Sequence, residues 1–298
     1  MIPETVRFGT SSWAYEGWKG QVYQQPYPKS RFAKACLKEY AAYEHDGRPL
    51  FRTVGVDHSF YRPPTAAQWS AYAEQVPDDF QICAKVWEEV TIPAFATHPR
   101  YGQKAGKENH RFLDAALCEE LVLAPARTGL GNRAGPMIFE FQRFGLDPES
   151  FIPALDHFLS KLAPGHPYAV EVRNPAILGI RYHDVLKAHG AAHVYNHWSF
   201  MPPLAEQHRR MERFTAPFTV LRLLTPLRMS YEQAKKRAGL YDKIVGELPQ
   251  MRQETIGLVR QAVAESRQAY VLVNNRAEGN APLTIQAIVD ELETQETP

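Results

Sequence analysis

The sequence predicts an α/β fold, a single (β/α)₈ TIM-barrel-like domain over residues 1–298. Eight short runs of β-branched and aromatic residues recur along the chain, and helical patterns separate them. No linker or low-complexity stretch divides the chain. Because each strand–helix crossover must return over the sheet, this alternation favours parallel strands.

The strand candidates fit a closed barrel better than an open doubly wound sheet. The open fold usually carries a Gly-rich phosphate turn after its first strand. Here the first strand ends in Gly9–Trp13, which contains no GxGxxG pattern. We therefore expect eight barrel strands, at Val6–Ser11, Phe51–Asp57, Phe80–Val86, Pro136–Phe141, Tyr168–Arg173, Ala192–His197, Phe218–Leu224 and Tyr270–Asn275.

Capping residues and apolar periodicity place the helices between these strands. Ser30 predicts a helix running through Tyr40, with Gly47 just past its end. Two longer insertions, 87–108 and 225–248, follow the third and seventh strands, on the side where barrels build their sites. The other helix signals are a capping box at Thr65 and Gln68, an apolar face from Phe112 to Leu121, a cap at Asp147, helical patterns at Tyr182–His189 and Leu204–Met211, and helix starts at Pro249 and Thr284.

Composition limits the function classes. The chain has 34 basic and 33 acidic residues, so it carries no broad basic surface of the kind that binds nucleic acid. No apolar run reaches the roughly 18 residues of a spanning helix. The first residues, Met1–Glu4, show no basic region followed by an apolar stretch, so we expect no secretory signal. Three scattered cysteines form neither a disulfide framework nor a zinc motif. We expect a cytoplasmic protein without a membrane or nucleic-acid partner and without a cofactor, and the oligomeric state stays open.

Strand alternation predicts which polar side chains point into the barrel. Glu140 lies between two phenylalanines that suit the helix-facing side, so Glu140 is expected to point inward. Glu171 and Arg173 alternate with two valines in the same way. At the ends of the sixth and eighth strands, 195–198 and 273–276, either orientation fits the pattern. Lys85, Asp57 and Arg222 are also expected on the inner face.

These groups predict a polar site at the C-terminal mouth of the barrel. Glu140 and Glu171 are the candidate catalytic acid/base pair, because such chemistry needs two carboxylates in different environments. An equally good interpretation pairs each glutamate with a neighbouring arginine in a structural salt-bridge layer. We expect no bound metal. The candidate substrate-binding residues are Trp13, Tyr15, Asp57, Tyr61, Lys85, Arg173, His197, Arg222, Asn274, Asn275 and Arg276.

Several segments together resemble the YecE-like family, known as domain of unknown function 72. The opening Gly9–Tyr15, the second-strand segment Phe51–Tyr61 and Glu171–Asn174 are similar to its motifs. The C-terminal Asn274–Asn275 and Gly279–Pro282 resemble its signature. The resemblance spans nearly the whole chain and implies a TIM-barrel-like fold without a settled activity. Phe80–Lys85 and Arg222 also fit the pattern.

The chain departs from that pattern at positions near the expected site. Gly55 stands where the family usually has Glu, and Asp57 where it usually has Asn. Asn196 replaces an Asp, and Phe141–Phe144 replaces a Gln-Leu-Pro-Pro stretch. The sequence therefore predicts a divergent branch whose chemistry differs from that of closer members.

Three hypotheses for function follow. The first is an enzyme that acts on a small anionic, sugar-like or phosphorylated molecule, and hydrolysis, isomerisation and elimination all fit it. The second is a metal-dependent hydrolase or isomerase that uses Asp57, Glu140, Glu171 and His197. The third is a non-catalytic protein associated with a ligand or with nucleic acid.

Overall fold

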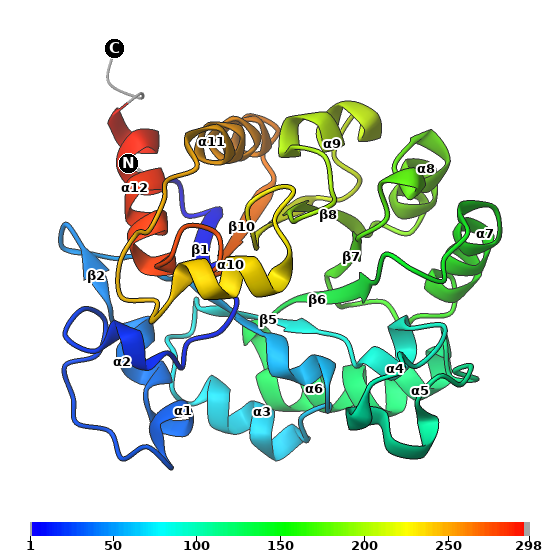
Figure 1. The fold of residues 1–298 in the computed structure, drawn as a ribbon, viewed down its shortest axis with the longest axis horizontal. Coiled ribbons are helices and arrows are strands. Elements are labelled where there is room, and N and C mark those ends of the chain that lie inside the picture. Colours follow the sequence, from blue (N-terminus) through cyan, green and yellow to red (C-terminus); the bar gives the residue numbers. More distant parts are fainter. Residues whose placement is uncertain (1, 295–298) are drawn as a thin grey trace.

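A computed structural model describes residues 2–294, and its strands close into a barrel of eight parallel strands (Figure 1). The order around the barrel is β1-β10-β9-β8-β7-β6-β5-β4, and pairing of β1 with β4 closes it. The barrel prediction is confirmed. The strands are β1 (Val6–Thr10), β4 (Thr53–Val56), β5 (Gln81–Lys85), β6 (Ala134–Phe141), β7 (Tyr168–Val172), β8 (Ala192–His197), β9 (Phe218–Leu223) and β10 (Gln268–Val273).

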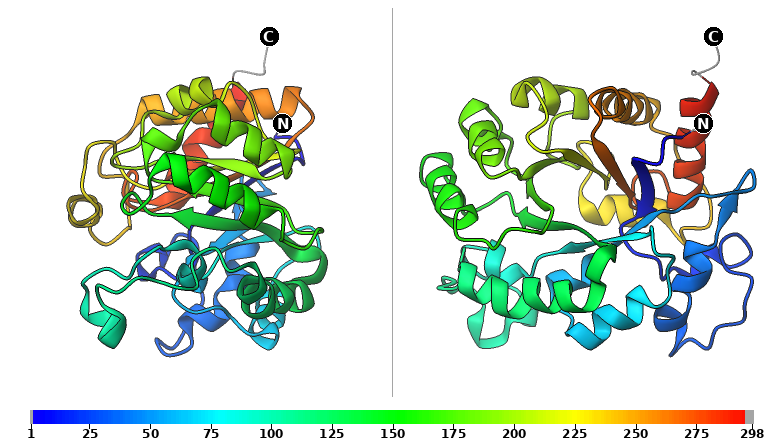
Figure 2. Two further views of the ribbon diagram at one scale, coloured as in Figure 1. Left: turned by 90° about the vertical axis from the view of Figure 1, so that its right-hand side faces the viewer. Right: turned by 180° about the vertical axis from the view of Figure 1, so that it is seen from behind.

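Helices surround the strands on the outside of the barrel (Figures 1 and 2). Each barrel strand is followed by helical structure before the next barrel strand or the end of the described chain, which is the alternation that a parallel barrel requires. The helices are α1 (Phe32–Ala35), α2 (Leu37–Ala41), α3 (Ala66–Ala73), α4 (Glu88–Thr91), α5 (Ala115–Cys118), α6 (Ala124–Leu130), α7 (Pro148–Leu159), α8 (Ile180–Ala188), α9 (Leu204–Met211), α10 (Tyr231–Ala238), α11 (Pro249–Ala264) and α12 (Ala281–Thr294).

Strand patterns and helix-capping residues in the sequence predicted several elements correctly. All eight predicted strands overlap the observed ones. The capping box before α3 is present: the Thr65 hydroxyl accepts from the Gln68 N–H, and the Gln68 side chain accepts from the Thr65 N–H. Asp147 caps α7 by accepting from the Ser150 N–H. The helix predicted at Leu204–Met211 matches α9.

The segment after β1 differs from the prediction. Two short helices, α1 and α2, meet at Cys36, and α1 begins after Arg31 with no cap from Ser30. Gly47 does not end a helix but lies in the turn of an additional hairpin, β2 (Glu44–His45) and β3 (Arg48–Pro49). Asp46 and Gly47 both have positive φ, 50° and 73°, which is the backbone that a two-residue hairpin turn requires. The Asp-Gly pair was the hairpin signal in this stretch.

Other helices begin a few residues away from their predicted starts. The last helix begins at Ala281 rather than at Thr284, because Asn280 Oδ1 accepts the Leu283 N–H at 2.9 Å and acts as the cap. The apolar face predicted from Phe112 is divided, since α5 begins only at Ala115 and passes into a π-helical segment, Glu119–Leu123. The insertions 87–108 and 225–248 contain α4 and α10.

Apolar side chains fill the barrel and the layer between strands and helices. The interior cluster contains Cys83, Ile138, Ala169, Val194, Val220 and Leu272, mostly small and β-branched side chains suited to the narrow space. The outer cluster packs alternate strand residues such as Phe139 and Phe141 against the helices. Among the described residues, no helix has the length and apolar character needed to cross a membrane.

Gly9 permits the close approach of β1 and β4 that closes the barrel. A Cβ at Gly9 would lie 1.9 Å from the Thr53 carbonyl oxygen, so an added methyl group must push backbone apart. We expect Gly9→Ala to lower the free energy of unfolding by about 1–3 kcal/mol or more, measured by chemical denaturation. Gly257→Ala in α11 is the control, because nothing lies within 4 Å of its Cβ position and alanine favours a helix. Equal stability of the two variants would contradict this account of closure.

Candidate functional site

The inner layer at the C-terminal end of the barrel is polar on every strand. On six strands the apolar interior residue is followed, two positions later and therefore on the same face, by a polar one. The other two strands have Gly9 and Gly55 in the layer below. The layer contains Ser11, Asp57, Lys85, Glu140, Glu171, Asn196, Arg222 and Asn274.

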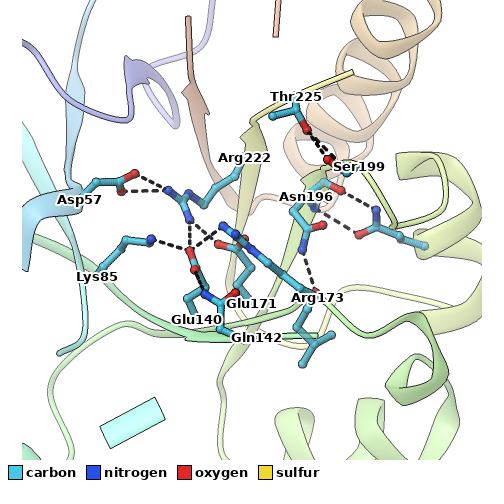
Figure 3. Close-up of polar contacts among 12 residues, drawn as sticks. Asp57, Lys85, Glu140, Gln142, Glu171, Arg173, Asn196, Ser199, Arg222 and Thr225 are labelled. Carbon is cyan, nitrogen blue, oxygen red and sulfur yellow. Dashed lines mark hydrogen bonds and ion pairs between the residues drawn. The ribbon is translucent and has the colours of Figure 1, made fainter. Parts of the chain in front are cut away.

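Arg222 lies at the centre of this layer and bonds three carboxylates (Figure 3). Its Nη2 donates to both oxygens of Asp57, at 2.9 and 2.8 Å. Its Nη1 donates to Glu171 at 2.5 Å and to Glu140 at 3.1 Å. The Arg222 side chain is fully buried, so these charge-assisted bonds replace water at its two amino groups, while its Nε has no partner among the described residues.

Glu140 is a second residue on which several hydrogen bonds and ion pairs meet. The Glu140 Oε2 atom accepts from Lys85 Nζ at 2.6 Å and from Arg173 Nη2 at 2.7 Å, and Gln142 donates to Oε1 at 2.6 Å. Arg173 also donates through Nε to Glu171 at 3.0 Å. Glu140 and Glu171 are paired neighbours on β6 and β7. The predicted acid/base carboxylates thus lie together, and each also bonds arginine, as the salt-bridge interpretation expects.

Aromatic rings cover the cations that reach the rim. Lys85 Nζ lies 4.4 Å from the centre of the Phe60 ring, and Arg173 lies 4.8 Å from the Trp198 ring. Lys85 and Arg173 therefore each have a carboxylate on one side and a ring on another. Such contacts hold the cationic groups in fixed positions at the mouth.

Arg276 adds a cation without adding a carboxylate. It stacks on Tyr231 at 4.4 Å, and within residues 2–294 no carboxylate lies at ion-pair distance from it. Its Nε is buried and has no hydrogen-bond partner in the described part of the chain. Lys85, Arg173 and Arg222 balance Asp57, Glu140 and Glu171, so Arg276 adds a positive charge that this network does not balance.

Electrostatics keep the central groups charged. Burial alone would raise the pKa of Glu140, but Arg173, Lys85 and Arg222 outweigh it and hold that pKa well below its usual range. Burial would likewise lower the pKa of Arg222, and its carboxylates raise it instead. Glu140 is therefore ionised at neutral pH and, with all these contacts in place, has no proton to donate as a general acid.

Tyr15 and Tyr61 lie at the rim. Tyr15 packs against Trp18 and Tyr241, with ring centres 4.8 and 5.4 Å apart. Burial raises the pKa of Tyr15, while the nearby Arg276 lowers it and Asp57 raises it, so this phenol lies within electrostatic reach of both. Tyr61 is 61% exposed and lies beneath Arg100.

Four other predicted binding residues hold backbone groups in place. Trp13 Nε1 donates to the Ala33 carbonyl at 2.9 Å. Asn275 Oδ1 accepts from the Ala281 N–H and from Trp18 Nε1. The remaining contacts join His197 Nδ1 to the Thr225 carbonyl and Asn274 Oδ1 to the Arg276 N–H.

Ser11, Asn196 and Arg143 are among the residues near the mouth that were not predicted as site residues. Ser11 and Asn196 follow inward-facing positions, Gly9 and Val194, by two residues. Strand alternation therefore predicts that they point inward once the inward-facing positions of their strands are known. Ser11 Oγ and Asn196 Oδ1 are buried without hydrogen-bond partners among the described residues. Arg143 stacks on Phe200 at 4.3 Å, but it lies in a loop, where no periodic pattern marks it.

Asp57, Glu140, Glu171 and His197, the residues considered for a metal, do not form a group of ligand atoms within 4.8 Å of one another in the described structure. Asp57, Glu140 and Glu171 bond arginine, and the Nδ1 atom of His197 lies 2.9 Å from the Thr225 carbonyl oxygen. Among the described residues, three potential ligand atoms come together elsewhere, at His45, Asp46 and Asp290. His45 and Asp290 already form an ion pair of 2.7 Å there.

Comparisons with known proteins give a family from the sequence and the same fold from solved structures. The family described as "Protein of unknown function DUF72" matches residues 7–298. A DUF72 family protein of Thermotoga maritima, TM1631, has a similar structure, with 19% identity, a TM-score of 0.61 and coverage of 97% of this chain and 99% of its own. Two structures of the DUF72 protein EF0366 of Enterococcus faecalis are similar at 15% and 14% identity, with TM-scores of 0.67 and 0.57. They cover 96% of this chain in both cases, and 95% and 97% of their own. No curated protein matches the chain.

Glu171 is fully buried between Arg222 and Arg173, so its removal leaves buried cations short of a partner. Breaking a buried pair in this way costs about 3–5 kcal/mol. We expect a loss of that size in the free energy of unfolding for Glu171→Ala, measured by chemical denaturation. Glu149→Ala is the matched control, because Glu149 pairs with Arg181 on the exposed surface, where such pairs contribute about 0–1 kcal/mol. Equal losses in the two variants would show that Glu171 is solvated.

The lowered pKa of Glu140 predicts acid sensitivity. The usual value is 4.5, so in acid the unfolded chain binds this proton at a higher pH than the folded protein does. The contribution to stability is complete above that value and is lost as the pH falls below it. We expect the unfolding free energy of the parent to fall more steeply than that of Glu140→Gln between about pH 5 and about pH 3. Parallel slopes would mean that Glu140 lacks its cationic partners in solution.

Proposed function

Because this chain belongs to the DUF72 family of proteins of unknown function, we propose its function from the mouth itself: it binds a small anionic, sugar-like molecule and acts on it by acid/base chemistry. The observation that carries the proposal is Arg276, a cation with a buried, unpartnered Nε beside a balanced network of charges. An unpaired guanidinium in a partly buried position favours a bidentate anion, carboxylate or phosphate.

The rest of the mouth suits a hydroxyl-bearing molecule. A sugar hydroxyl both donates and accepts, so its site needs acceptors as well as donors. Asp57, half-buried, offers carboxylate oxygens, while Ser11 Oγ and Asn196 Oδ1 lack partners in the described chain. The aromatic rings of Trp198 and Tyr61 at the rim support stacking against a sugar ring.

Ligand binding itself would prepare Glu140 for proton transfer. Arg173 and Lys85 keep Glu140 ionised. A negative charge that the ligand brings to the mouth raises the pKa of Glu140, because like charges disfavour the ionised carboxylate. Glu171 keeps its contact with Arg222. The two carboxylates, whose strands lie about 5 Å apart, then occupy different environments, as hydrolysis, isomerisation and elimination require.

Anion binding is testable by thermal shift with phosphate, sulfate, glucose 6-phosphate and glucuronate. We expect millimolar concentrations of at least one to raise the melting temperature, because a ligand of the folded state at about 100 times its Kd adds about 2.7 kcal/mol. Arg276→Gln should lose at least half of the rise, and Arg181→Gln, an exposed arginine paired with Glu149, should keep it. The proposal fails if none of these anions raises the melting temperature or if Arg276→Gln responds as the parent does.

Catalysis and simple binding differ in the response of Glu140→Gln. Amide replacement keeps the size of the side chain but removes the proton-exchanging carboxylate. If the mouth is an active site, this variant binds the anion and turns over no substrate. Turnover equal to that of the parent would assign the chemistry elsewhere.

A further inference from the structure

A second arginine at the mouth shares the unusual environment of Arg276. Arg143 follows β6 and stacks on Phe200 at 4.3 Å and on Phe144 at 5.4 Å. Within residues 2–294, no carboxylate lies at ion-pair distance from Arg143, so this guanidinium also has a ring and no counter-charge. The contact between Arg143 and Phe200 joins the loops after β6 and β8.

The two arginines follow strands on opposite sides of the barrel. β6 and β10 are separated by β7, β8 and β9 in one direction and by β5, β4 and β1 in the other. Eight strands spaced about 4.8 Å apart and tilted by about 36° close into a barrel about 15 Å across. Arg143 lies against Phe200 in the loop after β8, whereas Arg276 lies against Tyr231 of α10, and no ring contact joins Phe200 to Tyr231 among the described residues. Each arginine therefore offers its own position for an anionic group.

Exposed aromatic rings accompany these arginines. The exposed Phe and Tyr side chains of the described chain are Tyr61, Phe144, Phe200 and Tyr231, with exposed fractions from 47% to 79%. All four lie in segments that follow the C-terminal ends of barrel strands. Rings left exposed on one face only, next to unpaired arginines, are typical of a binding surface.

From this arrangement we infer that the ligand is a short chain of acidic sugars that lies across the mouth, with one carboxylate at Arg276 and another at Arg143. The inference rests on the proposed function and names its substrate class. Tyr231 and Phe200 each lie directly beside one of the two arginines, so each end of the chain meets a ring for stacking and a guanidinium for its charge.

The groups between the two ends favour a sugar chain over a single-stranded nucleic acid. A nucleic-acid strand carries a phosphate at every step, and its middle would lie over the carboxylates of Asp57, Glu140 and Glu171. The chain as a whole has a formal charge of only +1. A sugar chain with hydroxyls in its middle instead finds acceptors and donors there, including Asp57, Asn196 and Gln142.

The test compares chain lengths by isothermal titration calorimetry with glucuronate as the monomer and a hyaluronan tetrasaccharide as the tetramer, because the tetrasaccharide carries a carboxylate on every second sugar only. We expect the parent to bind the tetramer at least about tenfold more tightly than the monomer. In Arg143→Gln and Phe200→Ala the ratio of the two affinities should fall toward one, because the second contact is lost. Arg276→Gln should weaken both ligands. Arg181→Gln is the control with an exposed, paired arginine, and circular dichroism checks the fold of each variant.

The outcomes separate this inference from the proposed function. If the monomer binds and the tetramer binds no more tightly, the chain-like ligand is wrong while the anion site stands. If neither binds and no small anion does, both proposals fail. Maltotetraose, a neutral chain, should bind at least about tenfold more weakly than the acidic tetramer, and equal binding would overturn the role of the arginines. Tighter binding of a single-stranded oligodeoxythymidylate through the same residues would overturn the assignment to sugar.

Discussion

The burial of Arg222 is the constraint on which the mouth depends. A guanidinium without water is costly, and it is stable here because carboxylates from the ends of β6 and β7 and from the residue after β4 all reach it. The same bonds fix where these carboxylates lie. Removing one partner of a buried ion pair destabilises a protein. Replacing the whole pair by well-packed apolar side chains, in contrast, often leaves the stability unchanged or raises it. The value of Arg222 to the molecule is therefore positional: it sets the geometry of Asp57, Glu140 and Glu171.

A second buried ion pair fixes the loop that carries Arg276. Glu278, fully buried, accepts from Arg252 of α11 and from the Leu248 N–H, and its own carbonyl accepts from the Val245 N–H. Arg237 of α10 donates to the Ala277 carbonyl and so joins this loop to the insertion after β9. The position of Arg276 against Tyr231 thus depends on α10, α11 and the loop after β10 together. α10 contains three consecutive basic residues, Lys235 to Arg237. Arg237 makes the structural contact described above, while Lys235 and Lys236 are exposed.

Strand alternation predicted which polar side chains point into the barrel wherever they alternate with apolar residues, and it predicted nothing beyond that. Glu140 and Glu171 each alternate with apolar neighbours, so their inward orientation was readable, and Lys85 and Arg222 followed in the same way. Asn196 and His197 are both polar, so alternation does not indicate which of the two side chains points into the barrel. Arg143 lies in a loop without any period, and its role depends on Phe200 from another loop, a contact that only the folded chain makes. The bonds within the mouth join residues far apart in sequence, and no local signal specifies them.

The apolar layer beneath the polar one explains why a ligand would approach from one side only. Ile138, Ala169 and Val220 lie one inward position below Glu140, Glu171 and Arg222, and all three are buried. Water therefore cannot solvate the charges from within the barrel, and the low-dielectric layer strengthens every interaction above it. Buried polar atoms without a partner among the described residues, such as Arg276 Nε and Ser11 Oγ, are costly unless a ligand or water bonds them. Because solved structures related at 14–19% identity have the same barrel, the fold does not specify the chemistry, and the polar groups at the mouth are where this chain's own activity has to be sought.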